Sequence, residues 1–495
     1  MRKIFLICIL ILMQAFVSYA VDDPLKRGMQ LYKKNHYEEA AKLLYHHLSA
    51  SGSKQQAETY LSLGLVYFAN AKLYRELYHA SIAVQIDYLT KLYAADSKSQ
   101  SRFVKFYLGR VLMEAGELIE AAAFFKKFLE DEKVQPQYKA HATVHMGTIY
   151  FLQGKPDKAR NLWSGLKVSE PRTLTALAAA YGRYGLKEKN PASMCRQALD
   201  QLKQTGKHPS IDSISNIIEV YTREGTIEQG IELLQHADLK GYFQEETLIK
   251  NKVIRFYDSA LLRNLAMLYE KASLKYLTRA AAVADEKLKG LAQYYLSLGY
   301  GYFGRPEESM KIIDSFVSSA RLPIQFQNKA KVAQAVNNYL LGKQKAAKAQ
   351  FDALLQLKAE PYLVADILLA CTRYNIEFPQ AVINATALAQ KGEDRRYYSV
   401  NFALGRYYLG QKDYPRATTY MEAGRDKSNK NRIEFNDPLM LVDLAKTYHL
   451  TKKYSESLEI YFEMSKQFPA VRQIQVAMQG VYSMEQKSAG DVKIF

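Results

Sequence analysis

Small, apolar and aromatic residues recur at helical spacing along nearly the whole chain. The stretch 404–421 contains the pair Leu404-Gly405, followed by Tyr408, Tyr414 and Ala417. Forty residues later, the stretch 444–461 repeats this order of small, aromatic, aromatic, small and aromatic residues. Steps of three and four residues place these positions on one face of a helix. The pattern predicts two helices joined by a short turn, with small residues where the helices approach each other closely.

The same order of residues can be followed through the chain. We call the small or apolar residue at the centre of each first helix the anchor. Successive anchors are 31 to 48 residues apart, and most steps are near the period of about 34 that stacked helix pairs show. The predicted anchors are Gly28, Gly64, Gly109, Gly147, Gly182, Ile218, Ala266, Ser297, Ala335, Ala370, Gly405 and Ala445.

This pattern resembles the tetratricopeptide repeat, whose motif runs Leu-Gly-x-x-Tyr, Gly-x-Tyr, Ala and a closing Pro such as Pro469. The resemblance implies an all-α, right-handed superhelical solenoid of helix–turn–helix units over residues 21–469. The fifth, seventh and tenth units match the motif only weakly. The predicted units lie near 21–52, 57–95, 102–134, 140–170, 174–205, 211–240, 259–288, 290–320, 328–360, 361–390, 398–430 and 438–469.

The resemblance also assigns packing roles within the units. Residues 470–495 are apolar at helical spacing and are expected to form a terminal capping helix and tail. We expect no strand and no second domain, and the segments 236–250 and 422–438 are expected to be polar loops. The residues expected to pack the helix pairs are Gly28, Ala40, Gly64, Gly109, Ala121, Gly147, Ala159, Gly405, Tyr408, Ala417, Tyr448 and Tyr454.

The first twenty residues have the composition of an export signal. Arg2 and Lys3 precede an apolar run over 4–13, and the small residues Ser18 and Ala20 flank an expected cleavage site after Ala20. The run is shorter than the ~20 residues that a membrane span needs, although an uncleaved anchor is the alternative. These features predict a protein exported to a bacterial periplasm or secreted.

The cysteine content argues against a disulfide framework. Cys8 lies inside the apolar run, so removal of the signal leaves Cys195 and Cys371. Residues so far apart in a solenoid lie several repeats away from each other, beyond the ~7 Å between Cα atoms that a disulfide bridges. We therefore expect two buried free thiols.

The formal net charge of +18 falls to +16 when Arg2 and Lys3 leave with the signal. In an exported protein, a basic surface favours an acidic protein, an acidic polysaccharide or anionic lipid headgroups, and no nucleic acid is expected. The charges are scattered along the chain, so general solubility is the alternative explanation.

No catalytic or cofactor motif is found. The chain has no Gly-x-Ser-x-Gly elbow and no phosphate-binding Gly-x-x-x-x-Gly-Lys-Ser/Thr loop. The best metal-binding candidate is His141 with His145, but Ala142 stands where a zinc protease would carry Glu. We therefore expect a structural role for both histidines, no metal, no cofactor and no enzymatic activity.

The resemblance implies a binding groove lined by positions 2, 5, 9 and 12 of each first helix. The lining would be aromatic with isolated cations, which suits an extended or helical peptide with apolar residues and an occasional acid. The alternative is that coiling of the array buries these aromatic residues as core. The candidate groove residues are Phe103, Phe106, Arg110, Phe151, Tyr294, Phe402, Arg406 and Lys446.

Two functions follow from these observations. The first is a non-catalytic exported scaffold or adaptor that binds protein partners in envelope complex assembly or secretion. The second resembles the tetratricopeptide components of exopolysaccharide export machines and would bind an acidic polysaccharide. An enzyme with an accessory array would need a further domain, and the residues after Pro469 are too few to form one.

The assigned register can be tested at Ala417. A leucine at this position should overpack the contact between the two helices and lower the free energy of unfolding by about 1–3 kcal/mol. Thermal unfolding of the Ala417→Leu variant measures the effect, and an unchanged midpoint would contradict the register.

Overall fold

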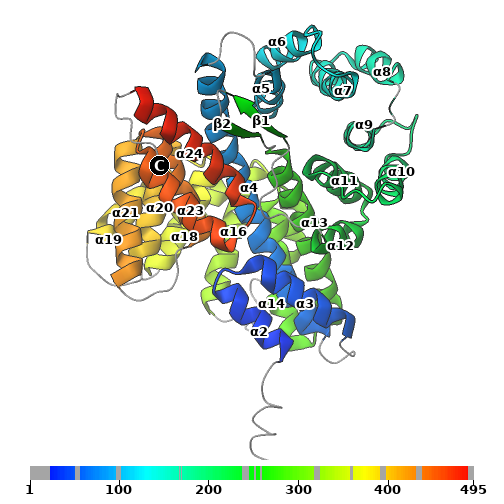
Figure 1. Cartoon of the computed structure of the whole chain (residues 1–495). Coiled ribbons are helices and arrows are strands. Elements are labelled where there is room, and N and C mark those ends of the chain that lie inside the picture. The colour runs from blue at the N-terminus through cyan, green and yellow to red at the C-terminus, as the bar shows by residue number, and fades with distance from the viewer. Residues whose placement is uncertain are drawn as a thin grey trace, which may run out of the picture. The chain divides into compact units, whose positions relative to one another are not determined.

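The computed structural model describes residues 23–50, 56–95, 102–166, 168, 170–236, 245–249, 252–256, 259–316, 324–356, 360–390, 397–430 and 437–488. The predicted export signal and Cys8 lie outside these residues. The chain divides into two compact units, and Figure 1 labels most of their helices. The first unit combines Met1–Asn70 with Ala272–Ala359, and the second combines Ala71–Lys271 with Glu360–Phe495.

The first unit is built from helix pairs. Two long helices, α4 (Gln56–Ala95) and α13 (Ala260–Val283), each contribute one part to this unit and one part to the second. The other helices of the first unit are α2 (Pro24–Lys33), α3 (Tyr37–Ala50), α14 (Glu286–Tyr302), α15 (Pro306–Phe316), α16 (Ile324–Leu340) and α17 (Gln344–Gln356).

The second unit contains two further runs of helix pairs and one hairpin. The first run is α5 (Arg102–Ala115), α6 (Leu118–Leu129), α7 (Pro136–Leu152), α8 (Pro156–Ser164), α9 (Pro171–Arg183), α10 (Pro191–Gln204), α11 (Ile211–Glu224) and α12 (Ile227–His236). The second run is α18 (Pro361–Arg373), α19 (Pro379–Ala389), α20 (Tyr397–Gly410), α21 (Tyr414–Lys430), α22 (Pro438–Leu450), α23 (Tyr454–Gln467) and α24 (Val471–Ser488). These helix pairs confirm the all-α repeat fold.

Each helix pair turns at a residue with a positive φ angle. This residue lies seven positions after the anchor, where the first helix must end and the chain must reverse. Glycine, asparagine and, twice, lysine occupy it: Asn35, Gly116, Gly154, Gly185, Gly225, Gly304, Gly342, Asn375, Lys412 and Lys452. The rule places the weak fifth and tenth anchors at Ala178 and Leu368 instead of Gly182 and Ala370, because neighbouring small residues allowed several registers.

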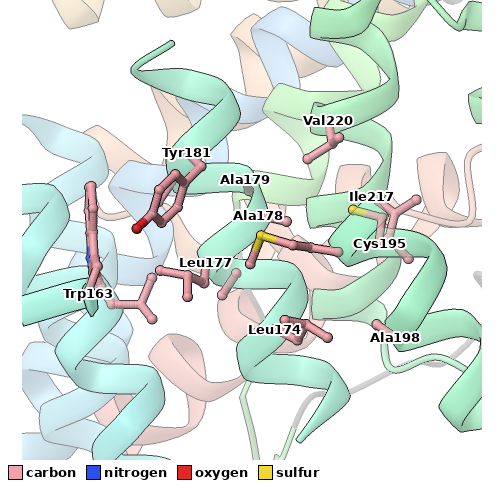
Figure 2. Packing of buried hydrophobic residues seen from close by; sticks show 14 of the residues in the cluster. Trp163, Leu174, Leu177, Ala178, Ala179, Tyr181, Cys195, Ala198, Ile217 and Val220 are labelled. Carbon is pink, nitrogen blue, oxygen red and sulfur yellow. The ribbon is translucent and has the colours of Figure 1, made fainter. Parts of the chain in front are cut away.

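The anchor contact brings the two helices of a pair close together. A Cβ atom added to Gly147 would lie 2.2 Å from Trp163 Nε1, and one added to Gly405 would lie 2.5 Å from Met421 Cγ. Trp163 is fully buried and its Nε1 donates a hydrogen bond of 3.0 Å to the carbonyl of Val144. Figure 2 shows Trp163 in the cluster that α7 to α11 form around it.

The residues expected to pack the helix pairs are mostly buried. Tyr448 is buried and its hydroxyl donates a hydrogen bond of 2.7 Å to Glu422. Tyr408 and Tyr454 are only half-buried. The remaining expected residues are all buried: Gly28, Ala40, Gly64, Gly109, Ala121, Gly147, Ala159, Gly405 and Ala417.

The second and seventh predicted units do not form helix pairs. Residues 56–95 are one helix of 40 residues, and residues 260–283 are one helix of 24 residues. Seven positions after the predicted anchors Gly64 and Ala266 stand Ala71 and Ser273, which do not favour a positive φ angle. Each helix therefore continues through the position at which the other first helices end.

One repeat is instead assembled from α4 and α13 within the first unit. A Cβ atom on Gly64 would lie 2.6 Å from Leu277 Cγ, so Leu277 fills the place opposite this anchor. Ser273 donates a hydrogen bond of 2.9 Å to the carbonyl of Gly64. Ser309 makes the equivalent bond to the carbonyl of the anchor Ser297 at 2.7 Å within a pair of consecutive helices. The two helices of this composite repeat are thus separated by some 200 residues of sequence.

The expectation of no strands was wrong. Strands β1 (Glu245–Ile249) and β2 (Lys252–Phe256) form an antiparallel hairpin in which Thr247 faces Ile254. Strand β1 lies in the segment 236–250, which was expected to be a polar loop, and β2 follows that segment. Both strands contain β-branched residues and β2 ends in Phe256, and these residue types favour strands.

The cysteine prediction is confirmed. Cys195 and Cys371 are both free and buried, and burial raises the pKa of each thiol to about 12. Among the residues that the structure describes, no helix has the length and apolar character needed to cross a membrane.

The composite repeat can be tested with a double-mutant cycle. Gly64→Ala should lower the free energy of unfolding by about 1–3 kcal/mol because its methyl group clashes with Leu277. In a Leu277→Ala background the clash is absent, so the same change should cost at least about 1 kcal/mol less. Urea unfolding of the four proteins measures this coupling, and additive effects would show that the two helices do not form one repeat.

Candidate functional site

The richest cluster of charged side chains lies in the second unit, on the first helices of successive pairs and on the start of α13. We call it the inner-face cluster. Its carboxylates are buried, Arg110 is buried with them, and Arg223 and Arg263 are partly exposed. Its members are Arg110, Glu114, Arg172, Arg183, Asp212, Glu219, Arg223 and Arg263.

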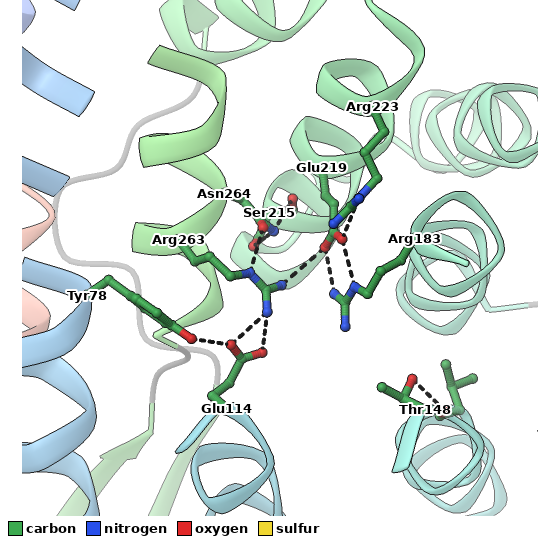
Figure 3. A network of polar contacts seen from close by, with 10 residues as sticks. Tyr78, Glu114, Thr148, Arg183, Ser215, Glu219, Arg223, Arg263 and Asn264 are labelled. Atoms are coloured by element: carbon green, nitrogen blue, oxygen red, sulfur yellow. Dashed lines mark hydrogen bonds and ion pairs between the residues drawn. The ribbon is translucent and has the colours of Figure 1, made fainter. Parts of the chain in front are cut away.

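Glu219 on α11 is the centre of one half of the cluster. Its side chain is fully buried and accepts two hydrogen bonds from Arg183, at 2.8 and 2.7 Å. Arg223 and Arg263 add bonds of 3.0 and 3.2 Å. Burial alone would raise the pKa of Glu219, but the adjacent guanidinium groups outweigh it and hold this pKa far below its usual range. Figure 3 shows these contacts.

Arg263 connects α13 to helices far from it in sequence. It donates bonds of 2.7 and 2.6 Å to Glu114 on α5, and the Tyr78 hydroxyl of α4 donates a bond of 2.7 Å to the same carboxylate. The next residue of α13, Asn264, donates a hydrogen bond of 2.9 Å to the carbonyl of Ser215 on α11. The start of α13 therefore bridges α5 and α11 on the inner side of the array (Figure 3).

Asp212 is the centre of the other half. Its buried carboxylate lies 2.9 Å from Arg110 Nη1 and 2.6 Å from Arg172 Nη2. Burial opposes its ionisation, but these two cations hold the pKa of Asp212 well below its usual range. Arg172 also donates a bond of 3.3 Å to the Tyr107 hydroxyl. Helices α5, α9 and α11 are thus tied together through one carboxylate.

The cluster has more cations than anions. Among its members, all of which lie in the described part of the chain, five guanidinium groups accompany three carboxylates, a formal charge of +2. The side chains of Asp212 and Glu219 have no exposed area, whereas those of Arg223 and Arg263 are 36% and 28% exposed. An acidic group arriving from solvent would therefore meet guanidinium groups first.

His141 and His145 lie beside this cluster. Their rings are 5.0 Å apart and both contact Phe106, while His145 stacks on Phe125. Burial, reinforced by the nearby arginines, lowers the pKa of both well below the usual value, so both are neutral at pH 7. No group of three potential metal ligands occurs in the described part of the chain.

A small cavity remains inside the cluster. Its volume is about 20 Å³, enough for a single water molecule. Its polar lining includes Arg110, Glu114, His145, Arg183 and Arg263. A cavity of this size cannot hold a small-molecule ligand.

The structure places the predicted groove residues in two groups. Four are half-buried: Phe103, Phe151, Arg406 and Lys446. Four are buried: Phe106, Arg110, Tyr294 and Phe402. The buried aromatics act as core, as the ring contacts of Phe106 with Phe125 and Phe128 show. Arg110 belongs to the inner-face cluster, and Arg406 and Lys446 lie on a second charged group.

This second group surrounds Arg406 on α20. Its guanidinium lies 2.6 Å from Glu76 of α4 and 2.8 Å from Asp443 of α22. Burial of Asp443, together with the charge of Glu76, outweighs Arg406 and Lys446 and raises the pKa of Asp443 to about 7. Burial also opposes ionisation of Glu76, but Arg406 lowers the pKa of that carboxyl.

Sequence reasoning missed the acidic partners of these arginines. Glu219 stands in the apolar run Ile-Ile-Glu-Val-Tyr, directly after the anchor Ile218, and Asp443 stands in a similar apolar run before the anchor Ala445. A charged residue at an otherwise apolar position of a first helix was the available signal. It identifies the acid but not its partner, which comes from another repeat.

The chain has low similarity to several solved structures. No family model and no curated protein matches the chain. Similar solved structures include a tetratricopeptide repeat protein from Parabacteroides merdae, with a TM-score of 0.27 and 13% identity over 70% of this chain and 99% of that chain. Cut9–Hcn1 of the APC/C has a TM-score of 0.28 and 13% identity over 94% and 98% of the two chains. Yeast Tom70 has a TM-score of 0.27 and 14% identity over 77% and 87%. At these scores the likenesses say nothing about function, and the repeat fold rests on the helix pairs themselves.

The raised pKa of Asp443 predicts a specific pH dependence. The folded state holds the proton more tightly than the unfolded chain, whose Asp titrates near pH 4, so this stabilisation is complete below pH 4 and is lost as the pH rises to about 7. Asp443→Asn keeps a neutral group there. Between pH 5 and 7, the unfolding free energy of the native protein should fall by on the order of 1 kcal/mol per pH unit. The unfolding free energy of Asp443→Asn should not show this fall.

Urea unfolding of both proteins at pH 5, 6, 7 and 8 measures this difference. The control is Glu459→Gln, which removes an exposed carboxylate on α23. Its unfolding free energy should change with pH as that of the native protein does. Equal slopes in the native protein and in Asp443→Asn would show that Asp443 is ionised throughout this range.

Proposed function

We propose that this protein is a non-catalytic scaffold or adaptor that binds protein partners through its repeat array, and that its partners present acidic segments. The observation that carries the proposal is the excess of guanidinium groups in the inner-face cluster. Arginine binds carboxylates with two parallel hydrogen bonds and is enriched at binding hot spots. The half-exposed arginines at the edge of the cluster offer such donors to an incoming acidic side chain.

We further propose that the protein acts at the bacterial cell envelope, in complex assembly or secretion. The support is the export signal over residues 1–20, with cleavage expected after Ala20. Fractionation of the cells followed by N-terminal sequencing tests this location. A mature chain that begins at Val21 in the periplasmic fraction is expected, and a cytoplasmic chain that retains Met1 would contradict it.

Partner binding can be tested by removing the charge excess. Arg172→Gln with Arg223→Gln lowers the cluster charge by two, while Asp212 keeps Arg110 and Glu219 keeps Arg183 and Arg263. Crosslinking in the envelope fraction identifies the partner, and binding to the purified partner then measures the effect. We expect Kd to rise about tenfold, the effect of ~1.4 kcal/mol.

The matched control is Lys126→Gln with Lys127→Gln on the exposed face of α6, which removes the same charge elsewhere in the second unit. It should leave Kd unchanged. Equal affinities of the two double variants would show that the inner-face cluster does not bind the partner. A hydrolytic activity of the purified chain would overturn the non-catalytic assignment.

The alternative is a scaffold for export or binding of an acidic polysaccharide, which the net charge of +16 after removal of the signal favours. Binding of the purified protein to alginate at low and high salt distinguishes the two functions. Salt-sensitive binding that the cluster variant loses would favour the polysaccharide, and no binding at low salt would exclude it.

A further inference from the structure

The second half of α4 lies along the first helices of the C-terminal repeats within the second unit. Glu76 contacts Arg406 on α20 at 2.6 Å. Three turns further along α4, Asp87 Oδ2 lies 3.6 Å from His449 Nε2 on α22. Lys91 then pairs with Glu485 on α24. One continuous helix therefore contacts α20, α22 and α24, which alternate with α21 and α23 along the chain.

These contacts use the positions that were expected to bind a ligand. Counting from the anchors Gly405 and Ala445, Arg406 occupies position 9 of its first helix and His449 occupies position 12. Both positions belong to the set that the tetratricopeptide resemblance places on the groove. The surface predicted to receive a partner is thus covered by a helix of the same chain.

The packing between α4 and α24 is close. A Cβ atom added to Gly480 would lie 2.2 Å from the ring of Tyr88, so no larger residue fits at position 480 beside this ring. Between Glu76 and Tyr88, α4 buries Leu77, Ala80 and Val84 at the spacing of one helical stripe. A helix with an apolar stripe held in a groove of other helices is a known mode of peptide recognition.

The charges of the two surfaces are complementary. Glu76 faces the cation of Arg406, and Glu485 faces the ammonium group of Lys91. Asp443 also lies 2.8 Å from Nε of Arg406, which helps to fix the guanidinium for the contact with Glu76. Burial lowers the pKa of His449, so its contact with Asp87 is not an ion pair at neutral pH.

We propose that the inner faces of α20, α22 and α24 form a helix-binding site whose resident ligand is the segment 71–95 of α4. The partner that fits this site is an amphipathic helix with a carboxylate facing Arg406 and, twelve residues later, an aromatic ring facing Gly480. The site is closed while α4 occupies it and opens only by exchange of that helix. The groove helices α20, α22 and α24 carry no member of the inner-face cluster, so the proposal does not rest on binding of an acidic partner there, although Tyr78 of α4 bonds to Glu114 of that cluster.

The test uses the full chain and a fluorescent peptide of residues 71–95. Glu76→Arg in the chain places a cation opposite Arg406 and weakens the resident helix, so the variant should bind the peptide at least tenfold more tightly than the native chain does. A peptide that itself carries Glu76→Arg should not bind this variant. The control Glu459→Arg, on the exposed side of α23, should behave as the native chain.

Reversal of the groove charge provides the complementary measurement. A chain with Arg406→Glu should prefer the peptide that carries Glu76→Arg over the native peptide. Circular dichroism establishes that each variant is folded. If Glu76→Arg does not fold, Lys91→Glu in the chain and Glu485→Lys in the groove repeat the exchange at the other end of the site.

Three results would overturn the proposal. In the first, the Glu76→Arg chain folds but binds the native peptide no better than the native chain does. In the second, that chain binds the native peptide and the Glu76→Arg peptide equally well. In the third, the Arg406→Glu chain does not prefer the Glu76→Arg peptide. Anisotropy titrations at fixed ionic strength decide among these outcomes.

Discussion

The close approach of two helices at each anchor determines how this chain is put together. At most anchors a glycine, alanine or serine on the first helix leaves room for one large side chain from the second, as Gly147 does for Trp163 and Gly405 for Met421, whereas Ile218 and Leu368 are larger. The contact depends on the shapes of the two side chains and does not require that the two helices follow each other in the chain. Gly64 makes it with Leu277 from a helix some 200 residues away, and Ser273 adds the hydrogen bond that other second helices supply locally. The requirement to bury an apolar stripe is thus met by whichever helix is available.

The two long helices arise from the absence of a residue that ends a helix. In the described helix pairs, Gly, Asn or Lys adopts a positive φ angle seven positions after the anchor. Ala71 and Ser273 occupy this position in α4 and α13, and for ordinary side chains the left-handed conformation costs about 1–2 kcal/mol. Each helix therefore continues past this position, and its two parts contact the first helices of different repeats. The contacts of Arg263 with Glu114 and Glu219, and of Glu76 with Arg406, follow from this continuation.

The period of the anchors was sufficient to predict the repeat fold and the buried small residues. It was not sufficient for the second and seventh units, because Ala71 and Ser273 give no turn signal, and the turns at Lys412 and Lys452 show that this residue alone does not decide where a helix ends. The candidate groove was predicted from positions within one repeat. Its occupation by α4 and its acidic residues Glu219 and Asp443 involve partners from distant repeats, and a local pattern contains no information about those pairs.

Burial beside arginines has opposite effects on the pKa of Glu219 in the inner-face cluster and of Asp443 in the group around Arg406. Around Glu219, three guanidinium groups surround one carboxylate, and ionisation is favoured despite burial. Around Arg406, one guanidinium is shared by Glu76 and Asp443, so full ionisation of both acids would leave a buried negative charge. The proton on Asp443 removes it near neutral pH. Buried ion pairs add little net stability compared with apolar packing but penalise any arrangement that separates them. The pairs therefore specify which helix covers which face.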